Sequence, residues 1–230
     1  MNTTNILTKT YPVSNFERVV LHAQHENHLT IIQGKQEALA IRAPVDVLSR
    51  TKAHVRNGVL DINQGGDWLE RLRDALTTSL SRPEIYYTLR VEQLDSLEVY
   101  ALATITAKSL KAKHLSLKFS GPGILEIEDL QAKQLEVELS GINRVKLAGS
   151  TDSQSIVMRG MTQYDAGLLM SKHTEIEMTG PGDLTVWVLE QLDVDVRGPG
   201  SVSYYGTPQI QKNLSPISRL THLESTGVHA

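Results

Sequence analysis

Apolar and polar residues alternate along most of the chain between residues 84 and 208, with the period of two that is typical of β-strands. The alternation is divided into units of similar length, and five successive units carry a glycine at the same place: Gly121, Gly141, Gly160, Gly180 and Gly198. The spacings between these glycines are 20, 19, 20 and 18 residues. One unit further back the same pattern surrounds an alanine, Ala101. The region is therefore an internal repeat of β-strands.

Equivalent positions of the repeat carry the same class of residue. Two residues before each glycine, or before Ala101, the side chain is always apolar: Val99, Phe119, Leu139, Met158, Met178 and Val196. The residues that directly precede these are mostly charged and are expected to face solvent: Glu98, Lys118, Glu138, Val157, Glu177 and Asp195. In a solenoid, like positions stack about 4.8 Å apart and form continuous ladders, whereas antiparallel hairpins have no such requirement. The pattern predicts an all-β fold, a parallel β-solenoid that resembles a right-handed β-helix with 18–20 residues per coil, rather than a sandwich.

The repeated glycines mark a corner of each coil. Gly-Pro-Gly occurs at 121–123, 180–182 and 198–200. Proline holds φ near −65° and suits the position before a left-handed residue in a type II turn. We therefore expect positive φ at Gly123, Gly182 and Gly200, and Thr162 departs from this pattern because threonine tolerates positive φ poorly.

The flanks of the repeat differ from it. Residues 1–63 contain short strand candidates separated by turn signals and predict an N-terminal β region. Residues 64–83 place apolar side chains at helical spacing and predict an amphipathic helical insert, which either caps the end of the coil stack or binds a partner. Residues 84–208 form the solenoid repeats. From 209 to 230 the periodicity fades, which predicts a C-terminal cap and tail.

Composition excludes several classes of function. Charged residues make up 21% of the chain and the formal net charge is −3, so no electrostatic footprint for nucleic acid or an anionic membrane is expected. There is no cysteine, hence no disulfide and no thiolate metal site. No apolar run approaches the roughly 18 residues of a transmembrane segment. The first 15 residues show no signal peptide, which leaves the compartment open.

No residues point to catalysis or to a cofactor. His22, His25 and His28 lie close together in the sequence, and zinc would need three or four ligands that converge on one point. A polar turn without a ligand role is the favoured interpretation. Neither a Ser-His-Asp arrangement nor a phosphate-binding loop occurs in a fitting context.

Two groups of residues are candidates for binding. Trp187 and Tyr205 each lie seven residues after a corner glycine and should be neighbours on adjacent coils, where they suit either a flat sugar face or packing of the tail or a subunit. The register also predicts that like charges stack about 5 Å apart. The expected acidic pairs are Glu175 with Asp193 and Glu177 with Asp195. A solvated acidic face is the favoured interpretation, and a weak calcium site is the alternative.

Several motifs, in order, resemble the family of auto-transporter adhesins with a head GIN domain. The tripeptide Gly141-Ile142-Asn143 matches the name of the family, and Phe16-Glu17-Arg18-Val19 resembles its F-x-x-V entry. Val55 to Ile62 resembles V-x-N-G-x-L-x-I, and Tyr204 to Pro208 resembles the terminal Y-x-G-x-P with an extra tyrosine. The resemblance covers roughly residues 11–210. It implies a β-solenoid of bacterial origin, usually exported, and brings no established catalytic residues.

Together these observations favour a non-enzymatic binding or adhesion module whose partner is a surface glycan or a protein. One alternative is a carbohydrate-active enzyme, because parallel β-helices host such enzymes. The other is a structural protein that forms homo-oligomers through the faces or ends of the solenoid. The enzyme is disfavoured because no long insertion in the repeat builds a cleft around paired carboxylates.

Overall fold

The computed structural model describes residues 5–65 and 83–224, and within them the chain is almost entirely β-structure. The elements in chain order are β1 (Ile6–Tyr11), β2 (Arg18–Gln33), β3 (Ala38–Pro44), α1 (Val45–Arg50), β4 (Lys52–Arg56), β5 (Val59–Asn63), β6 (Glu84–Val91), β7 (Ser96–Ser120), β8 (Gly123–Ser140), β9 (Ile142–Met158), β10 (Met161–Met178), β11 (Gly182–Val196), β12 (Gly200–Tyr205), β13 (Gln209–Leu214) and β14 (Arg219–His222).

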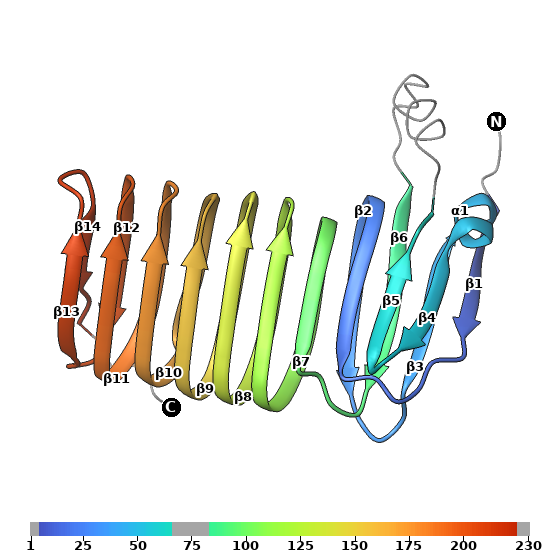
Figure 1. Cartoon of the computed structure of the whole chain (residues 1–230), viewed down its shortest axis with the longest axis horizontal. Helices are drawn as coiled ribbons and strands as arrows, with labels where there is room; N and C mark the ends of the chain where they lie inside the picture. The colour runs from blue at the N-terminus through green and yellow to red at the C-terminus, as the bar shows by residue number, and fades with distance from the viewer. Residues whose placement is uncertain (1–4, 66–82, 225–230) are drawn as a thin grey trace.

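The repeat forms a parallel β-solenoid, as its periodicity predicts. Strands β7 to β12 lie side by side in chain order, and each pairs in parallel with the next (Figure 1). The predicted register holds: Phe119 lies opposite Leu139, and Met158 opposite Met178. The alternative of antiparallel hairpins within the repeat is thereby excluded.

The interior is a stack of apolar ladders. All six side chains predicted to point inward two residues before the corner are at most 3% exposed, namely Val99, Phe119, Leu139, Met158, Met178 and Val196. Their predecessors along the chain lie at the surface and are half-buried. Because every coil contributes the same positions, the core continues along the whole solenoid without interruption.

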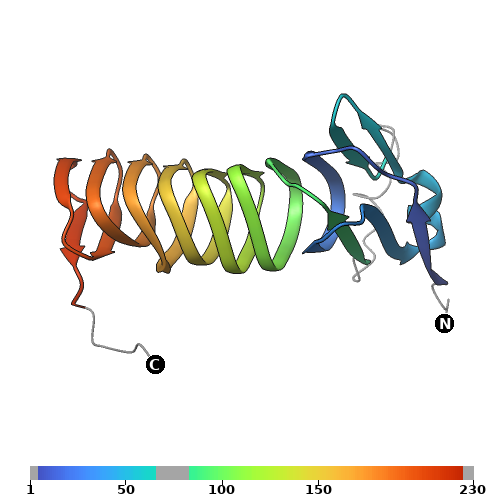
Figure 2. The ribbon, with the colours of Figure 1, turned by 90° about the horizontal axis from the view of Figure 1, so that it is seen from below.

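Each long strand bends between two halves, which lie on the two sides of the flattened solenoid (Figure 2). The halves meet at two edges. We call the edge formed by the corners after Ala101, Gly121, Gly141, Gly160, Gly180 and Gly198 the glycine edge. At the opposite edge the pairing register shifts, for example between Ile127 and Leu130 and between Asp165 and Leu168. Such irregularities let a strand turn without ending.

The corner glycines are needed for a different reason from the one the sequence suggests. Gly123, Gly182 and Gly200 do not adopt positive φ, so that prediction is wrong, and Thr162 is an ordinary strand residue opposite Asn143 and Gly182. The glycines are required because neighbouring coils approach backbone to backbone. A Cβ atom on Gly160 would lie 2.1 Å from the carbonyl oxygen of Gly141, and one on Gly180 would lie 2.4 Å from that of Gly160.

The Gly-Ile-Asn tripeptide illustrates this corner. Gly141 has φ of 106°, and a Cβ there would lie 2.7 Å from the carbonyl oxygen of Gly121. The buried Asn143 closes the turn by donating a hydrogen bond from Nδ2 to the carbonyl oxygen of Ser140 at 3.2 Å. Ile142, between them, points outward and is 63% exposed. The close approach of the backbones therefore explains the glycine, and the hydrogen bond explains the asparagine. Neither explains why residue 142 is an isoleucine.

The N-terminal region completes the stack out of chain order. Strand β2 pairs with β7 on one side, and on the other side it pairs with β5 through Arg18–His22 and with β6 through Glu26–Gln33. Strand β3 pairs antiparallel with β6, and β1 pairs antiparallel with β3. The short helix α1, which the strand pattern did not predict, follows β3. The helical insert was expected over residues 64–83, between β5 and β6, and of these residues 66–82 lie outside the described residues.

The C-terminal region continues the coil. Strand β13 pairs in parallel with β11, and β14 pairs with β12, so residues 209–222 lie in register with the repeat although their sequence lacks its periodicity. Lys212 lies opposite the buried Val194, which puts a charged residue in an otherwise apolar ladder at the free end. A charge in that place discourages another strand from adding to the edge. Among the helices of the described ranges, none is long and apolar enough to cross a membrane.

Candidate functional site

The predicted acidic array is formed by the strands that precede two successive corners. Glu175 lies opposite Asp193, and Glu177 lies opposite Asp195, in the parallel pairing of β10 with β11. Glu175 is exposed and the other three are half-buried. The stacking of like charges that the register predicts is therefore confirmed, and it needs compensation by solvent, by a cation or by a neighbouring side chain.

Arg197 supplies much of that compensation. It donates hydrogen bonds to Oδ2 of Asp195, from Nη2 at 2.5 Å and from Nε at 3.0 Å, and its Nη1 lies 4.0 Å from Oε1 of Glu177. The hydrogen bond to Asp195 and the charge of that carboxylate raise the pKa of Arg197. One arginine therefore serves carboxylates on two adjacent coils.

A shallow, open depression of about 450 Å³ lies over these strands and over β13. Arg197, Gln211, Lys212 and Asn213 line it together with the four acidic residues. Asn213 donates from Nδ2 to Oδ1 of Asp195 at 3.2 Å. The surface thus combines carboxylates, amides and the guanidinium of Arg197 within one small area.

Asp193 has unused hydrogen-bonding capacity in this depression. Its Oδ2 accepts a hydrogen bond from Nε2 of Gln191 at 2.8 Å, whereas its Oδ1 is shielded from solvent and has no partner. A shielded oxygen without a donor is unfavourable.

The calcium alternative finds no support in the side-chain arrangement. Over residues 5–65 and 83–224, no group of three or more histidine, aspartate or glutamate residues is close enough to hold a metal ion. The physical reason is that the acids stand in a ladder along the solenoid, and Arg197 lies where a cation would have to lie between Glu177 and Asp195.

Trp187 and Tyr205 are neighbours, as expected, but they do not line the depression. They lie opposite each other in the pairing of β11 with β12, with ring centroids 6.1 Å apart and ring planes inclined by 49°. They come from the strand halves that follow the corners, whereas the acidic array lies on the halves that precede them. The ring of Tyr205 lies beside Gly167, where a Cβ would approach it to 3.2 Å. Part of the aromatic surface is thus used in packing between coils.

The three clustered histidines do not converge. They all lie on one strand, β2, where the ring of His22 stacks on Tyr100 with centroids 4.9 Å apart, and that of His28 stacks on Tyr86 at 4.8 Å. Both tyrosines are the cross-strand partners of these histidines on neighbouring strands. His22 and His28 therefore take part in cross-strand stacking.

Two carboxyl groups elsewhere on the solenoid have clearly displaced pKa values, and both are displaced downward. Burial acts to raise the pKa of Glu138, but hydrogen bonds from Lys118 and Arg159 outweigh it and lower the pKa. A hydrogen bond from Lys172 lowers the pKa of Asp152. A catalytic acid needs the opposite displacement, so these two groups are ion-pair partners rather than proton donors.

Sequence reasoning found the acidic residues but missed the other residues of the depression. Arg197 could have been found, since it follows Asp195 by two positions and therefore lies on the same face of the strand. Gln211, Lys212 and Asn213 could not, because the apolar alternation that would place them in register is absent from that segment.

Comparison with known proteins agrees with this architecture. The family model described as "Putative auto-transporter adhesin, head GIN domain" matches residues 15–208. The fold is similar to that of a "putative adhesin" from Bacteroides fragilis, with a TM-score of 0.81 and 20% identity over 96% of this chain and 98% of that chain. A "putative lipid binding protein" and a "putative adhesin" from Parabacteroides distasonis each have a TM-score of 0.67 and 16% identity, over 96% of this chain and 98% of theirs. No curated protein matched the sequence.

Proposed function

We infer that this chain, which belongs to the family of auto-transporter adhesins with a head GIN domain, is a non-catalytic binding module that holds a surface glycan at the depression over β10, β11 and β13. The observation that carries this proposal is the mixed hydrogen-bonding surface of the depression, in which carboxylates of two coils lie beside the side chains of Gln211 and Asn213. The solenoid supplies a rigid, extended scaffold on which that surface is presented.

A glycan suits the depression because sugar hydroxyls both donate and accept hydrogen bonds. The carboxylates of Glu175 and Asp193 can accept from such hydroxyls, while the side-chain amides of Gln211 and Asn213 can donate to them. The depression is open rather than a deep pocket, which suits one segment of a longer chain. Binding to the side of a polymer is what an adhesion module requires.

The same geometry argues against hydrolysis of a bound glycan. Glycoside hydrolysis needs a carboxylic acid that protonates the leaving group beside a second carboxylate, usually in a cleft that holds the sugar. Here the carboxylate of Asp195 accepts hydrogen bonds from Arg197 and Asn213, and that of Asp193 accepts one from Gln191. We therefore assign binding, and not hydrolysis, to this surface.

The test is a glycan array probed with the purified chain and two variants, Asp193→Asn and Glu175→Gln. We expect the wild type to retain a defined set of glycans and both variants to lose at least about tenfold in affinity, equivalent to roughly 1.4 kcal/mol. The matched control is Glu136→Gln. Glu136 occupies the same register position as Glu175, two coils away and outside the depression.

Retention of no glycan by the wild type would overturn the proposal. So would retention that both depression variants leave unchanged, or that Glu136→Gln weakens equally. Release of shortened glycan on prolonged incubation would instead indicate an enzyme.

A further inference from the structure

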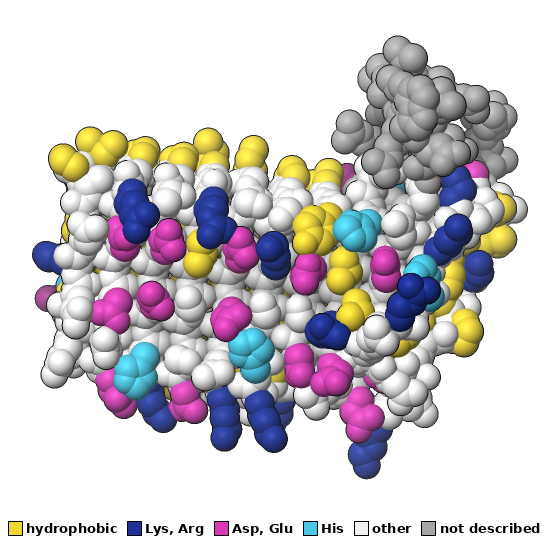
Figure 3. Space-filling view, viewed as in Figure 1, with side chains coloured by type: hydrophobic (Ala, Val, Ile, Leu, Met, Phe, Trp, Pro, Cys, Tyr) yellow, Lys and Arg dark blue, Asp and Glu magenta, His cyan; other side chains and the backbone are white. Residues whose placement is uncertain are grey.

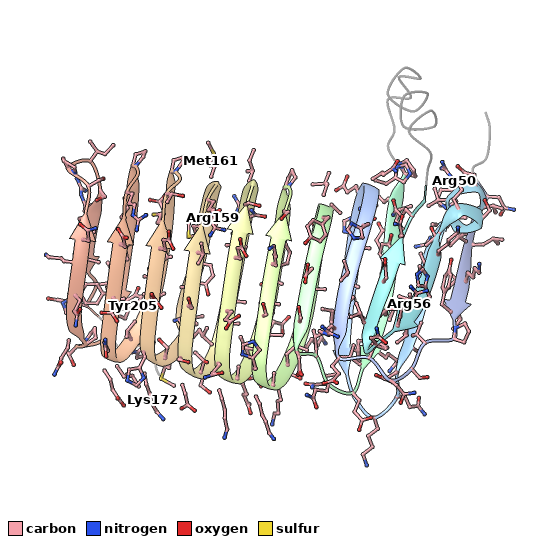
Figure 4. The ribbon with its side chains drawn as sticks, in the orientation of Figure 1. Arg50, Arg56, Arg159, Met161, Lys172 and Tyr205 are labelled. Carbon is pink, nitrogen blue, oxygen red and sulfur yellow. The ribbon has the colours of Figure 1, made fainter. Side chains whose placement is uncertain are left out.

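One row of apolar side chains runs along the glycine edge on the outside of the solenoid. Each coil contributes the residue directly after its corner position: Leu102, Pro122, Ile142, Met161, Pro181, Pro199 and, in the last coil, Ile217. All seven are exposed, with Ile142, Met161 and Ile217 exposed by 63%, 60% and 70%. We call these seven residues the apolar ridge. It forms the upper margin of the molecule in Figure 3, and Met161 is labelled there in Figure 4.

The ridge is not a by-product of the fold. The corner needs glycine for close backbone approach, and the prolines of the ridge also suit the fixed φ of the turn. Ile142, Met161 and Ile217 have no such explanation, because they are 63%, 60% and 70% exposed and no packing contact requires them to be apolar. The opposite edge has the same coil spacing and is largely charged, with Lys111, Lys133 and the ion pair of Lys172 with Asp152. Exposed apolar residues of the opposite edge, such as Leu168 and Leu189, are confined to the later coils. This difference between the two edges indicates that the apolar ridge is a binding surface.

The shape of the ridge points to a flat partner. Seven positions stacked at about 4.8 Å make a straight line of about 29 Å, with one side chain per coil. All seven can touch a planar surface at once because the coils are stacked in register. A stable protein interface uses about 20–30 residues from each partner, so a ridge of seven is too narrow to hold a second copy of this chain.

Arginines lie next to the ridge on both of its sides. On one side stand Arg159 and Arg197, each directly before a corner glycine; on the other stand Arg144 and Arg219, three residues after the corner position or its equivalent. Arg144 and Arg219 have no carboxylate within 4.0 Å in the described part of the chain, and Arg144 bonds only to Gln163. Apolar side chains that enter the interface, beside arginines at the phosphates, are the pattern of interfacial membrane binding.

We propose that the apolar ridge is a docking surface for a phospholipid bilayer, on which the solenoid lies with its long axis parallel to the membrane. Ile142, Met161 and Ile217 enter the boundary between headgroups and acyl chains, and Arg144 and Arg219 bind lipid phosphates. The net charge of −3 gives no overall attraction to an anionic surface, so the ridge supplies most of the affinity. The depression of the proposed function lies on a broad side of the solenoid and stays accessible in this orientation.

The first experiment measures cosedimentation with phosphatidylcholine–phosphatidylglycerol vesicles. We expect the full chain to bind, and the double variant Ile142→Ser/Met161→Ser to lower the bound fraction at least about fivefold. The double variant Arg144→Gln/Arg219→Gln should weaken binding by about fivefold per charge removed, since each cation near such a surface contributes about 1 kcal/mol. The matched control is Leu168→Ser/Leu189→Ser on the opposite edge, which should leave binding within about twofold of the wild type.

The second experiment locates the contact directly. The chain has no cysteine, so a single cysteine in Ile142→Cys can carry an environment-sensitive fluorophore, and Leu168→Cys, at a residue 64% exposed, serves as its control. On addition of vesicles the label at 142 should shift to shorter wavelength and brighten, while the label at 168 should not respond. Circular dichroism of each variant establishes that it is folded before binding is compared.

Three outcomes would overturn the proposal. The first is failure of the wild type to bind vesicles, and the second is an equal response of the labels at 142 and 168. The third is a response of the label at 142 to protein concentration without lipid, with a doubled mass by light scattering, which would make a second copy the occupant. Because glycan binding is measured without lipid and at other residues, failure here leaves the proposed function standing, and the reverse also holds.

Discussion

Arg197, directly after the end of β11, donates two hydrogen bonds to the carboxylate of Asp195, which lies two positions before it on that strand. This contact, together with the approach of Arg197 to Glu177 on the neighbouring coil, converts a column of like charges into a compensated surface. The arginine stands at the corner of the coil, where it can reach acids on two strands.

Removal of this arginine should expose the repulsion within the array. We expect Arg197→Gln to lower the free energy of unfolding by up to about 1 kcal/mol at low ionic strength, because the partners are largely exposed. The difference should shrink in about 1 M salt, where the screening length falls to about 3 Å. Thermal unfolding of both proteins at the two salt concentrations measures it. A salt-independent difference would contradict the electrostatic explanation.

Calcium should not stabilise the wild type. No described cluster offers three acidic or histidine ligands, and the known requirement of calcium is six to eight oxygen ligands. We expect the unfolding midpoint in millimolar calcium chloride to equal that in EDTA at matched ionic strength. A rise in the midpoint that Glu177→Gln abolishes would instead reveal a calcium site in the array.

Phe119 should be among the most costly core positions. Its side chain is 3% exposed in the inward ladder, so Phe119→Ala leaves a cavity that neighbouring coils cannot close, and we expect a loss of about 3–5 kcal/mol. Lys118→Ala is the adjacent control and should cost less than about 1 kcal/mol. Chemical denaturation measures both, and similar costs for the two would contradict the assignment of faces.

The corner glycines should resist even a methyl group. In Gly160→Ala the new Cβ would lie 2.1 Å from the carbonyl oxygen of Gly141, so two coils must separate, at a cost of at least about 1–3 kcal/mol. Gly34→Ala is the control, because nothing lies within 4 Å of a Cβ there. We expect a marked fall of the melting temperature in the first variant and little change in the second. Equal melting temperatures would mean that the corners tolerate separation of the coils.

Glu138 should contribute a pH-dependent increment of stability. Although burial opposes it, the hydrogen bonds from Lys118 and Arg159 lower its pKa below the ordinary 4.5, so the carboxylate is favoured in the folded state. The contribution is complete above that ordinary value and is lost as the pH falls through the folded-state pKa. With a side chain 40% exposed it stays below about 1 kcal/mol.

The corresponding measurement compares melting temperatures of the wild type and Glu138→Gln at about pH 6 and about pH 3. The variant should melt lower at the higher pH and match the wild type at the lower one. Glu126→Gln, at an ion pair with Lys146 at 3.7 Å on the other side of the coil, is a control for general effects of charge. A gap that persists at the lower pH would contradict the prediction.

The strand repeat, the register of its coils and the residue pairs between adjacent coils could be predicted from the sequence. The reason is that each coil of a solenoid pairs with the next coil along the chain. Once one unit is aligned on Gly121 and the next on Gly141, the opposition of Phe119 to Leu139, and likewise of Glu175 to Asp193, follows by counting. The helix α1 was missed because Val45–Arg50 spans too few residues to show a helical period. The place of β2 between β6 and β7 was missed because it depends on contacts between distant segments.

By itself, then, the sequence determined which side chains face inward, because alternation and unit length are local properties that every coil repeats. Only the tertiary structure decided why the corners are glycine, which cation compensates Asp195, and that Ile142 and Met161 share an exposed ridge. The corner glycines depend on the distance between the backbones of adjacent coils. The ion pair of Asp195 depends on how far the arginine side chain at the corner extends, and the ridge depends on the lack of any element packed over that edge. None of the three is encoded in the order of residues within a single unit, since each arises only when neighbouring coils are stacked.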